Sequence, residues 1–170
     1  MNIKILIVDD DISVIRSIGK TFTTMTQGFL VLTATSANEG LAMLKEQRPD
    51  VVLLDVRLGP NSGMDLLKDF NEYFKQPTNR KYEPRYIVIT AYPDEQTEKE
   101  ARETFHVDAF LMKPVKDEDI RRVVMKSIQK ILESFHDQLN AYTRSESLAK
   151  KKEEANQKLD EELKRSKGAS

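Results

Sequence analysis

The chain has 170 residues, with 27 Lys and Arg against 28 Asp and Glu, so its formal net charge is −1 at pH 7. A balance this close to zero argues against a protein that coats nucleic acid or an anionic membrane surface. The chain has no cysteine, which excludes disulfides, thiolate nucleophiles and cysteine-ligated metal sites.

Five short apolar runs occur in the first 135 residues, and each is rich in Val, Ile, Leu or Phe. Consecutive apolar positions over four to six residues are typical of strands that are covered on both faces. The predicted strands, in chain order, are 3–8, 29–34, 51–54, 85–89 and 109–112.

Segments with the apolar spacing of helices separate these strands. Asp11 is expected to cap the first helix, Ser36 and Glu39 form a capping box at the start of the second, and the fifth helix is predicted to begin near Asp117. Helical connections between buried strands require parallel pairing. The predicted fold is therefore α/β and doubly wound, with a five-stranded parallel sheet between helices.

The last 35 residues, 136–170, contain eight Lys or Arg and seven Asp or Glu, so a globular domain of residues 1–135 is predicted to carry a charged extension. Phe135, Leu139 and Tyr142 prolong the apolar stripe of the fifth helix beyond that domain. The extension is interpreted as a solvated helix, a homodimerising coiled coil or a contact with another protein. It is too short for a DNA-binding helix-turn-helix or a second catalytic domain, so no direct nucleic-acid contact is expected.

No segment of the chain has the length and apolar composition of a membrane span. The apolar run at 3–8 is also too short for the core of a signal peptide. The sequence therefore predicts a cytoplasmic protein without a membrane span.

Polar residues stand where four of the predicted strands end: Asp9 and Asp10, Asp55, Thr90, and Lys113. Ligands of open α/β sheets bind at the carboxyl ends of the strands. Clustered carboxylates repel one another unless a cation lies among them, and oxygen ligands without His or Cys favour Mg²⁺. A hydroxyl and an ammonium suit phosphoryl oxygens. This rim predicts Mg²⁺-dependent phosphoryl transfer, with a carboxylate as the nucleophile.

Four motifs occur in order along the chain: ILIVDDD at 5–11, VVLLD at 51–55, IVITA at 87–91 and FLMKP at 110–114. Together they resemble the receiver domain of two-component response regulators, over about residues 2–133. The resemblance implies a flavodoxin-like sheet of strand order 2-1-3-4-5 in a receiver domain of residues 1–135. It also implies a phosphorelay signalling domain, which is no enzyme beyond promoting its own phosphorylation and dephosphorylation.

The same resemblance implies roles for the acidic residues. Asp55 would accept a phosphoryl group from a histidine kinase or a histidine phosphotransfer protein. Asp10 and Asp55 would bind Mg²⁺ through their carboxylates, Asp9 would bind it through water, and Arg57 would contribute its backbone carbonyl.

Three further residues receive roles from the resemblance. Lys113 would pair with the acceptor carboxylate and then with the phosphate, and its bond to Pro114 would be cis. Thr90 would move toward the phosphate, and Phe110 would follow by changing rotamer. These movements would alter the surface around the fourth helix and the fifth strand.

Two features depart from the family pattern or refine it. His106 stands where the family often has a small residue, so it is expected to close the fourth helix in an unfavourable backbone conformation. Arg57 and Tyr92 lie two residues beyond Asp55 and Thr90, where bulky side chains are predicted to shield the phosphoryl group from water.

Three alternatives stay open. A Mg²⁺-dependent phosphatase of the haloacid dehalogenase type also carries Asp-x-Asp after its first strand, as Asp9 and Asp11 do, but Ile12-Ser13 stands in place of the expected Gly-Thr. A receiver-fold adaptor that is never phosphorylated is the second alternative. A phosphoacceptor role for His136 is the third, and it lacks the arginine and proline that normally follow such a histidine.

Overall fold

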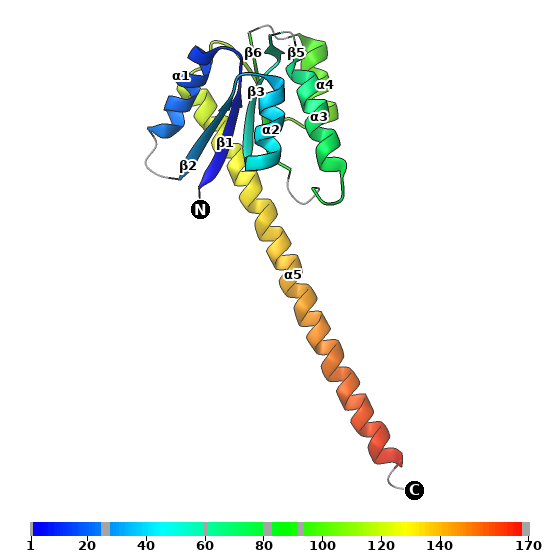
Figure 1. Cartoon of the computed structure of the whole chain (residues 1–170). Helices are drawn as coiled ribbons and strands as arrows, with labels where there is room; N and C mark the ends of the chain where they lie inside the picture. The colour runs from blue at the N-terminus through cyan, green and yellow to red at the C-terminus, as the bar shows by residue number, and fades with distance from the viewer. Residues whose placement is uncertain (1, 25–27, 60, 80–82, 92–93, 168–170) are drawn as a thin grey trace. The chain divides into compact units, whose positions relative to one another are not determined.

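The computed structural model describes residues 2–24, 28–59, 61–79, 83–91 and 94–167. The strands of the main sheet alternate with helices along this part of the chain (Figure 1). The elements are β1 (Ile3–Val8), α1 (Ile12–Thr23), β2 (Phe29–Ala34), α2 (Ala37–Gln47), β3 (Val51–Asp55), β4 (Arg57–Leu58), β5 (Asn61–Ser62), α3 (Gly63–Lys75), β6 (Arg85–Thr90), α4 (Glu95–Phe105), β7 (Ala109–Met112) and α5 (Asp117–Lys167).

Five strands form one parallel sheet in the order β2-β1-β3-β6-β7. Counted along the chain, this is the predicted order 2-1-3-4-5, so the flavodoxin-like fold is confirmed. Two of the predicted strands are one residue longer than expected, because β3 continues to Asp55 and β6 to Thr90. The two-residue strands β4 and β5, which pair antiparallel, were not predicted.

Helices cover both faces of the sheet (Figure 1). Gly19 of α1 lies beside Ile7, whereas Gly40 of α2 lies beside Val8, so these two helices pack on opposite faces of β1. The face of Val8 carries the largest apolar cluster, which α2, α3 and α4 close. Its buried members include Leu6, Leu44, Val52, Leu54, Leu66, Leu67, Phe70, Val88, Ala101 and Phe105.

The two edge strands differ from the prediction that every strand is covered on both faces. All five residues of the central strand β3 are buried, but β2 and β7 are only partly covered. Leu30 of β2 and Met112 of β7 are exposed. An apolar run predicts that a segment is a strand, but its coverage depends on its place in the sheet, and helices overlap an edge strand less completely.

The predicted helix starts are present, but one hydrogen bond of the predicted capping box involves a different amide. The Asp11 carboxylate accepts a hydrogen bond from the amide of Ser13 at 2.8 Å and caps α1. The Ser36 hydroxyl accepts from the amide of Glu39 at 3.3 Å, but the Glu39 carboxylate accepts from the amide of Thr35 at 2.7 Å, one residue before the position of a capping box.

His106 ends α4 with a φ of 51° and a ψ of 39°, as the departure from the family pattern predicted. This left-handed conformation places the Cβ atom close to a carbonyl oxygen, and it costs an ordinary residue roughly 1–2 kcal/mol. The helix end therefore carries local strain.

The Cα packing divides the chain into two compact units, residues 1–129 and 130–170. Helix α5 continues through both of them. In the second unit every side chain from 132 to 154 that the structure describes is exposed. The domain boundary predicted after residue 135 stays a prediction. None of the described helices combines the length and apolar character that crossing a membrane requires.

Candidate functional site

Parallel pairing brings the ends of four strands to one edge of the sheet. Leu54, one residue before Asp55, lies in register with Val8, one residue before Asp9. Thr90 lies in register with Met112, the residue before Lys113. The predicted site residues thus meet because the strands that precede them are aligned, although they are up to 104 positions apart in the sequence.

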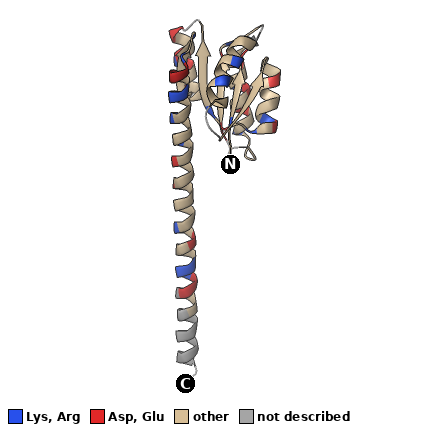
Figure 2. Cartoon of the chain, turned by 90° about the vertical axis from the view of Figure 1, so that its left-hand side faces the viewer, with Lys and Arg blue, Asp and Glu red and all other residues tan. Residues whose placement is uncertain are grey.

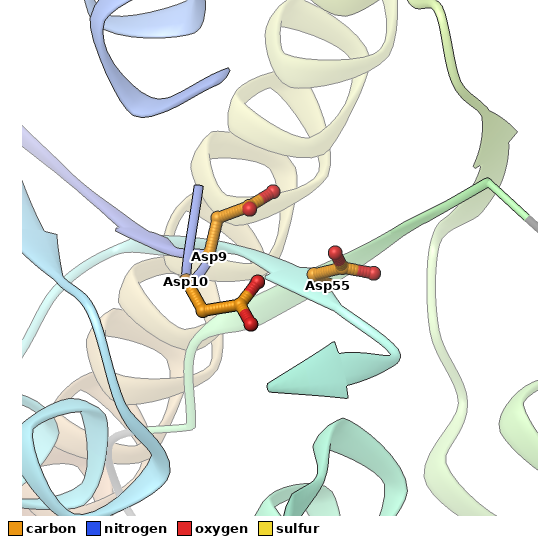
Figure 3. Close-up of side chains that lie close together, drawn as sticks. All are labelled: Asp9, Asp10 and Asp55. Carbon is orange, nitrogen blue, oxygen red and sulfur yellow. The ribbon is translucent and has the colours of Figure 1, made fainter. Parts of the chain in front are cut away.

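Three carboxylates form the centre of the site (Figure 3). Asp9, Asp10 and Asp55 each offer one oxygen, and these oxygens lie within 4.8 Å of one another. Asp9 and Asp55 are only 2% and 7% exposed, while Asp10 is exposed. The cluster is therefore open to solvent on one side, where a small ligand can enter.

Backbone amides hold each of these carboxylates in place. Asp9 accepts a hydrogen bond from the amide of Asp11 at 2.9 Å, and Asp55 accepts one from the amide of Arg57 at 3.1 Å. Asp10 accepts one from the amide of Gly59 at 2.9 Å, across the site. Gly59 has a φ of +58°, a conformation that glycine adopts without strain. The loop after β3 thus orients acidic groups from two different strands.

Lys113 contacts the cluster directly. Its ammonium donates to Oδ2 of Asp9 at 2.6 Å and to Oδ2 of Asp55 at 2.5 Å, and its side chain is 16% exposed. The peptide bond between Lys113 and Pro114 is cis, as the family resemblance implied. Burial alone would lower the pKa of Lys113, but its hydrogen bonds and attraction to Asp55 and Asp9 outweigh burial and raise that pKa. Lys113 therefore stays charged at neutral pH.

The carboxylates carry more negative charge than Lys113 can balance. Burial raises the pKa of Asp9, the hydrogen bond from Lys113 lowers it, and the charge of Asp55 raises it further, with a net increase. Three carboxyl groups share one ammonium in this cluster. The charge, the oxygen-only ligand set and the open side fit a hard divalent cation such as Mg²⁺.

Thr90 and Phe110, the residues of the predicted switch, lie on the neighbouring strands β6 and β7. Thr90 is the last residue of β6 and is buried, and its carbonyl accepts a hydrogen bond from the amide of Lys113 at 2.7 Å. Phe110 lies in β7 in register with Val88, and its half-buried ring packs against the apolar cluster. Arg57 is exposed beside Asp55. Tyr92, which was predicted to shield the phosphoryl group, lies outside the described residues.

Gly63 is a positioning residue that the sequence interpretation missed. A Cβ atom on this first residue of α3 would lie 2.0 Å from the carbonyl oxygen of Asp55 and 3.0 Å from the Cα of Val56. The amide of Gly63 also donates to the carbonyl of Val56 at 2.7 Å. A glycine directly after the capping residue Ser62 is the signal that could have indicated this close approach.

Comparison with known proteins leads to one family. The family described as "Response regulator receiver domain" matches residues 5–125. The acid tolerance regulatory protein ActR of Sinorhizobium medicae is 33% identical over 116 residues, which cover 68% of this chain and 55% of that protein. The alginate biosynthesis transcriptional regulatory protein AlgB of Pseudomonas aeruginosa is 30% identical over 128 residues, which cover 74% of this chain and 26% of that protein.

A solved structure agrees with these matches. The response regulator receiver domain protein (CheY-like) from Methanospirillum hungatei JF-1 superimposes with a TM-score of 0.65 at 26% identity, covering 78% of this chain and 99% of that one. The chain spans only about a quarter to about half of the length of the curated relatives that it matches.

Proposed function

The chain belongs to the response regulator receiver domain family of two-component signalling, and from this premise we propose that it accepts a phosphoryl group on Asp55 with the help of Mg²⁺. The observation that carries the proposal is the contact of the Lys113 ammonium with Asp55 and Asp9, beside a third carboxylate. Lys113 supplies one positive charge to a site that also needs a divalent cation. Both charges are suited to phosphoryl oxygens.

Asp55 acts as the nucleophile in this proposal. One of its carboxylate oxygens attacks the phosphorus atom of a phosphohistidine, a phosphorus–oxygen bond forms, and the phosphorus–nitrogen bond breaks. The leaving imidazole nitrogen keeps the electron pair of the broken bond. Two hydrogen bonds orient the Asp55 carboxylate for this attack, one from the amide of Arg57 and one from the ammonium of Lys113.

Asp10 and Asp55 would hold Mg²⁺ through their carboxylates, Asp9 would hold it through water, and the Arg57 carbonyl would complete the protein ligands. When bound, the ion supplies positive charge that stabilises the negative charge on the phosphoryl oxygens during transfer. Lys113 already lies against Asp55, so its ammonium has only to turn from the carboxylate to the new phosphate.

Thr90 and Phe110 would carry the signal away from the phosphoryl group. The Thr90 hydroxyl would turn toward a phosphoryl oxygen, and the space that it leaves would let the Phe110 ring change rotamer. Because Phe110 is only half-buried in the edge strand β7, its movement would alter the surface formed by α4 and β7. The readout is therefore proposed to be a change in protein contacts.

The family implies a histidine kinase or a histidine phosphotransfer protein as the donor. We place the chain among cytoplasmic signalling proteins that promote only their own phosphorylation and dephosphorylation. The downstream partner is proposed to be a protein, with no direct contact to nucleic acid. A homodimer through the C-terminal helix would be independent of this chemistry.

The test is incubation of the full chain with acetyl phosphate, with and without Mg²⁺, followed by intact-mass measurement. A phosphoryl adduct is expected in the wild type with Mg²⁺, and it should be lost on chelation and in Asp55→Asn. Asp11→Asn is the matched control, because asparagine also caps a helix and Asp11 lies two residues from Asp9. An adduct that persists in Asp55→Asn and disappears in Asp9→Asn would instead support the phosphatase alternative.

A further inference from the structure

A short apolar stripe runs along α5 outside the receiver core. It consists of Leu132, Phe135, Leu139 and Tyr142, which are 60%, 65%, 52% and 61% exposed. Their spacings of three, four and three residues place all four on one side of the helix, with the period of a coiled-coil seam. This 132–142 stripe lies entirely within the second compact unit, and no described residue of the chain buries it.

The positions beside the stripe carry no charge. In the heptad frame that assigns Leu132 and Leu139 to a, and Phe135 and Tyr142 to d, the flanking e and g positions are Gln129, Ile131, His136, Gln138, Thr143 and Ser145. The charged residues between 129 and 145 all occupy the outward b and f positions: Lys130, Glu133, Asp137 and Arg144. In Figure 2 this middle part of α5 is accordingly mostly tan.

Two hydroxyl groups at the end of the stripe are paired within the helix. The Tyr142 hydroxyl donates to the Glu146 carboxylate at 2.9 Å, so its ring can enter an apolar contact without an unsatisfied hydroxyl. The Thr143 hydroxyl donates to the carbonyl of Leu139 at 2.9 Å. Glu146 occupies the next a position, which ends the apolar seam.

We propose that the 132–142 stripe pairs with the same stripe of a second copy of this chain. Residues at e and g face the partner helix across the seam, so like charges there would oppose the pairing of two identical helices. The flanks from 129 to 145 hold no Lys, Arg, Asp or Glu, so two copies can pair without repulsion in either orientation. The same flanks offer no charge that would select a different partner of opposite charge. A packed apolar face would also stabilise this helical segment, whose described side chains from 132 to 154 are exposed.

The size of the stripe sets the strength of the pair. Two aromatic and two leucine side chains per copy cover on the order of 400 Å² per chain, about half of what a standard interface buries on each partner. The expected dimer is therefore weak, with a dissociation constant in the range of about 1–100 μM.

Sedimentation equilibrium of the full chain at loading concentrations of about 1–300 μM tests the pairing. The wild type should pass from monomer to dimer in this range, and Leu139→Lys and Phe135→Glu should each weaken association at least tenfold. Asn140→Lys is the matched control, because it adds the same charge as Leu139→Lys at the next residue, at an outward b position. It should associate like the wild type. At concentrations where the wild type is monomeric, thermal unfolding of residues 1–129 should not change in the two stripe variants, since both side chains are exposed in the single chain.

A wild type that stays monomeric throughout the range overturns the proposal, and so does a dimer that Leu139→Lys and Phe135→Glu leave intact. Far-UV circular dichroism provides a second readout, since the helical signal of the wild type should fall on dilution and that of Leu139→Lys should already be low. Asp55→Asn should still dimerise. The pairing can therefore fail or succeed independently of the proposed phosphoryl chemistry.

Discussion

Replacement of Gly63 by alanine should disturb the proposed phosphoryl site through backbone contact alone. The added methyl group would lie 2.0 Å from the carbonyl oxygen of Asp55, whereas ordinary contacts are 3.4 Å or longer. The start of α3 and the end of β3 must therefore separate by about 1 Å or more. The φ of Gly63 is not in the left-handed region, so backbone strain adds nothing to this effect.

The change in the free energy of unfolding combines two losses and one gain. Overpacking of a tight contact costs about 1–3 kcal/mol, and weakening the hydrogen bond from Gly63 to Val56 costs about 1 kcal/mol more. The higher helix propensity of alanine returns up to about 1 kcal/mol. The free energy of unfolding should fall by about 2 kcal/mol, which corresponds to a Tm lower by roughly 4–8 °C.

The functional loss should exceed the loss of stability. A shift of about 1 Å in a reacting group can reduce a rate about a hundredfold, and Asp55 is the residue whose carbonyl must move. The assay is the rate of adduct formation with acetyl phosphate at a temperature where the variant is fully folded, together with its Tm.

Gly19→Ala is the control for this substitution. Its Cβ would meet side chains at 3.7 Å and 4.0 Å, which are ordinary contacts, so it should raise the stability by up to about 1 kcal/mol and leave the adduct rate unchanged. A Gly63→Ala protein with the Tm and the adduct rate of the wild type would refute the reasoning.

Three other predictions concern the end of α4, the pH dependence and the lifetime of the phosphoryl group. His106→Gly should raise the free energy of unfolding by up to about 1 kcal/mol, because glycine adopts the left-handed conformation of this residue without steric cost; a lower Tm would contradict this account. Without Mg²⁺, acidification from pH 7 toward the raised pKa of Asp9 should stabilise the fold, because the native state binds a proton at a pH where the unfolded state does not. Asp11 and Asp94, whose pKa values are lowered by hydrogen bonds from Ser13 and Thr97, should lose their stabilising contribution only as the pH falls below the ordinary aspartate pKa of 3.8. The rise in Tm that comes from Asp9 should therefore be measurable between pH 7 and about pH 4, and Asp9→Asn should remove it. Arg57→Ala should shorten the half-life of the phosphoryl group, measured by loss of the adduct after removal of acetyl phosphate, and an unchanged half-life would remove the shielding role.

The sheet and the rim could be predicted because each depends on local sequence. Four to six consecutive apolar residues followed by a polar residue marked the ends of β1, β3, β6 and β7, and parallel pairing then brought Asp9, Asp55, Thr90 and Lys113 together. His106 could also be predicted, because no glycine stands at the end of α4 to adopt the left-handed conformation that closes a helix.

Other features depended on distances across the fold, which local sequence does not contain. The constraint on Gly63 comes from the carbonyl of Asp55, eight residues earlier in the chain, and becomes visible only once the loop after β3 has folded back. The contact of Asp10 with the amide of Gly59 joins residues 49 positions apart. The exposure of Leu30 and Met112 depends on which strands lie at the edges of the sheet.

Chemical mapping of the phosphoryl group tests the central claim most directly. Borohydride reduces an aspartyl phosphate to homoserine, so the full chain would be treated with acetyl phosphate and Mg²⁺, reduced, digested and sequenced by mass spectrometry. The account predicts homoserine at position 55 and unmodified aspartate at positions 9, 10 and 11. Homoserine at position 9 with an unchanged Asp55, or no homoserine at any position, would contradict it.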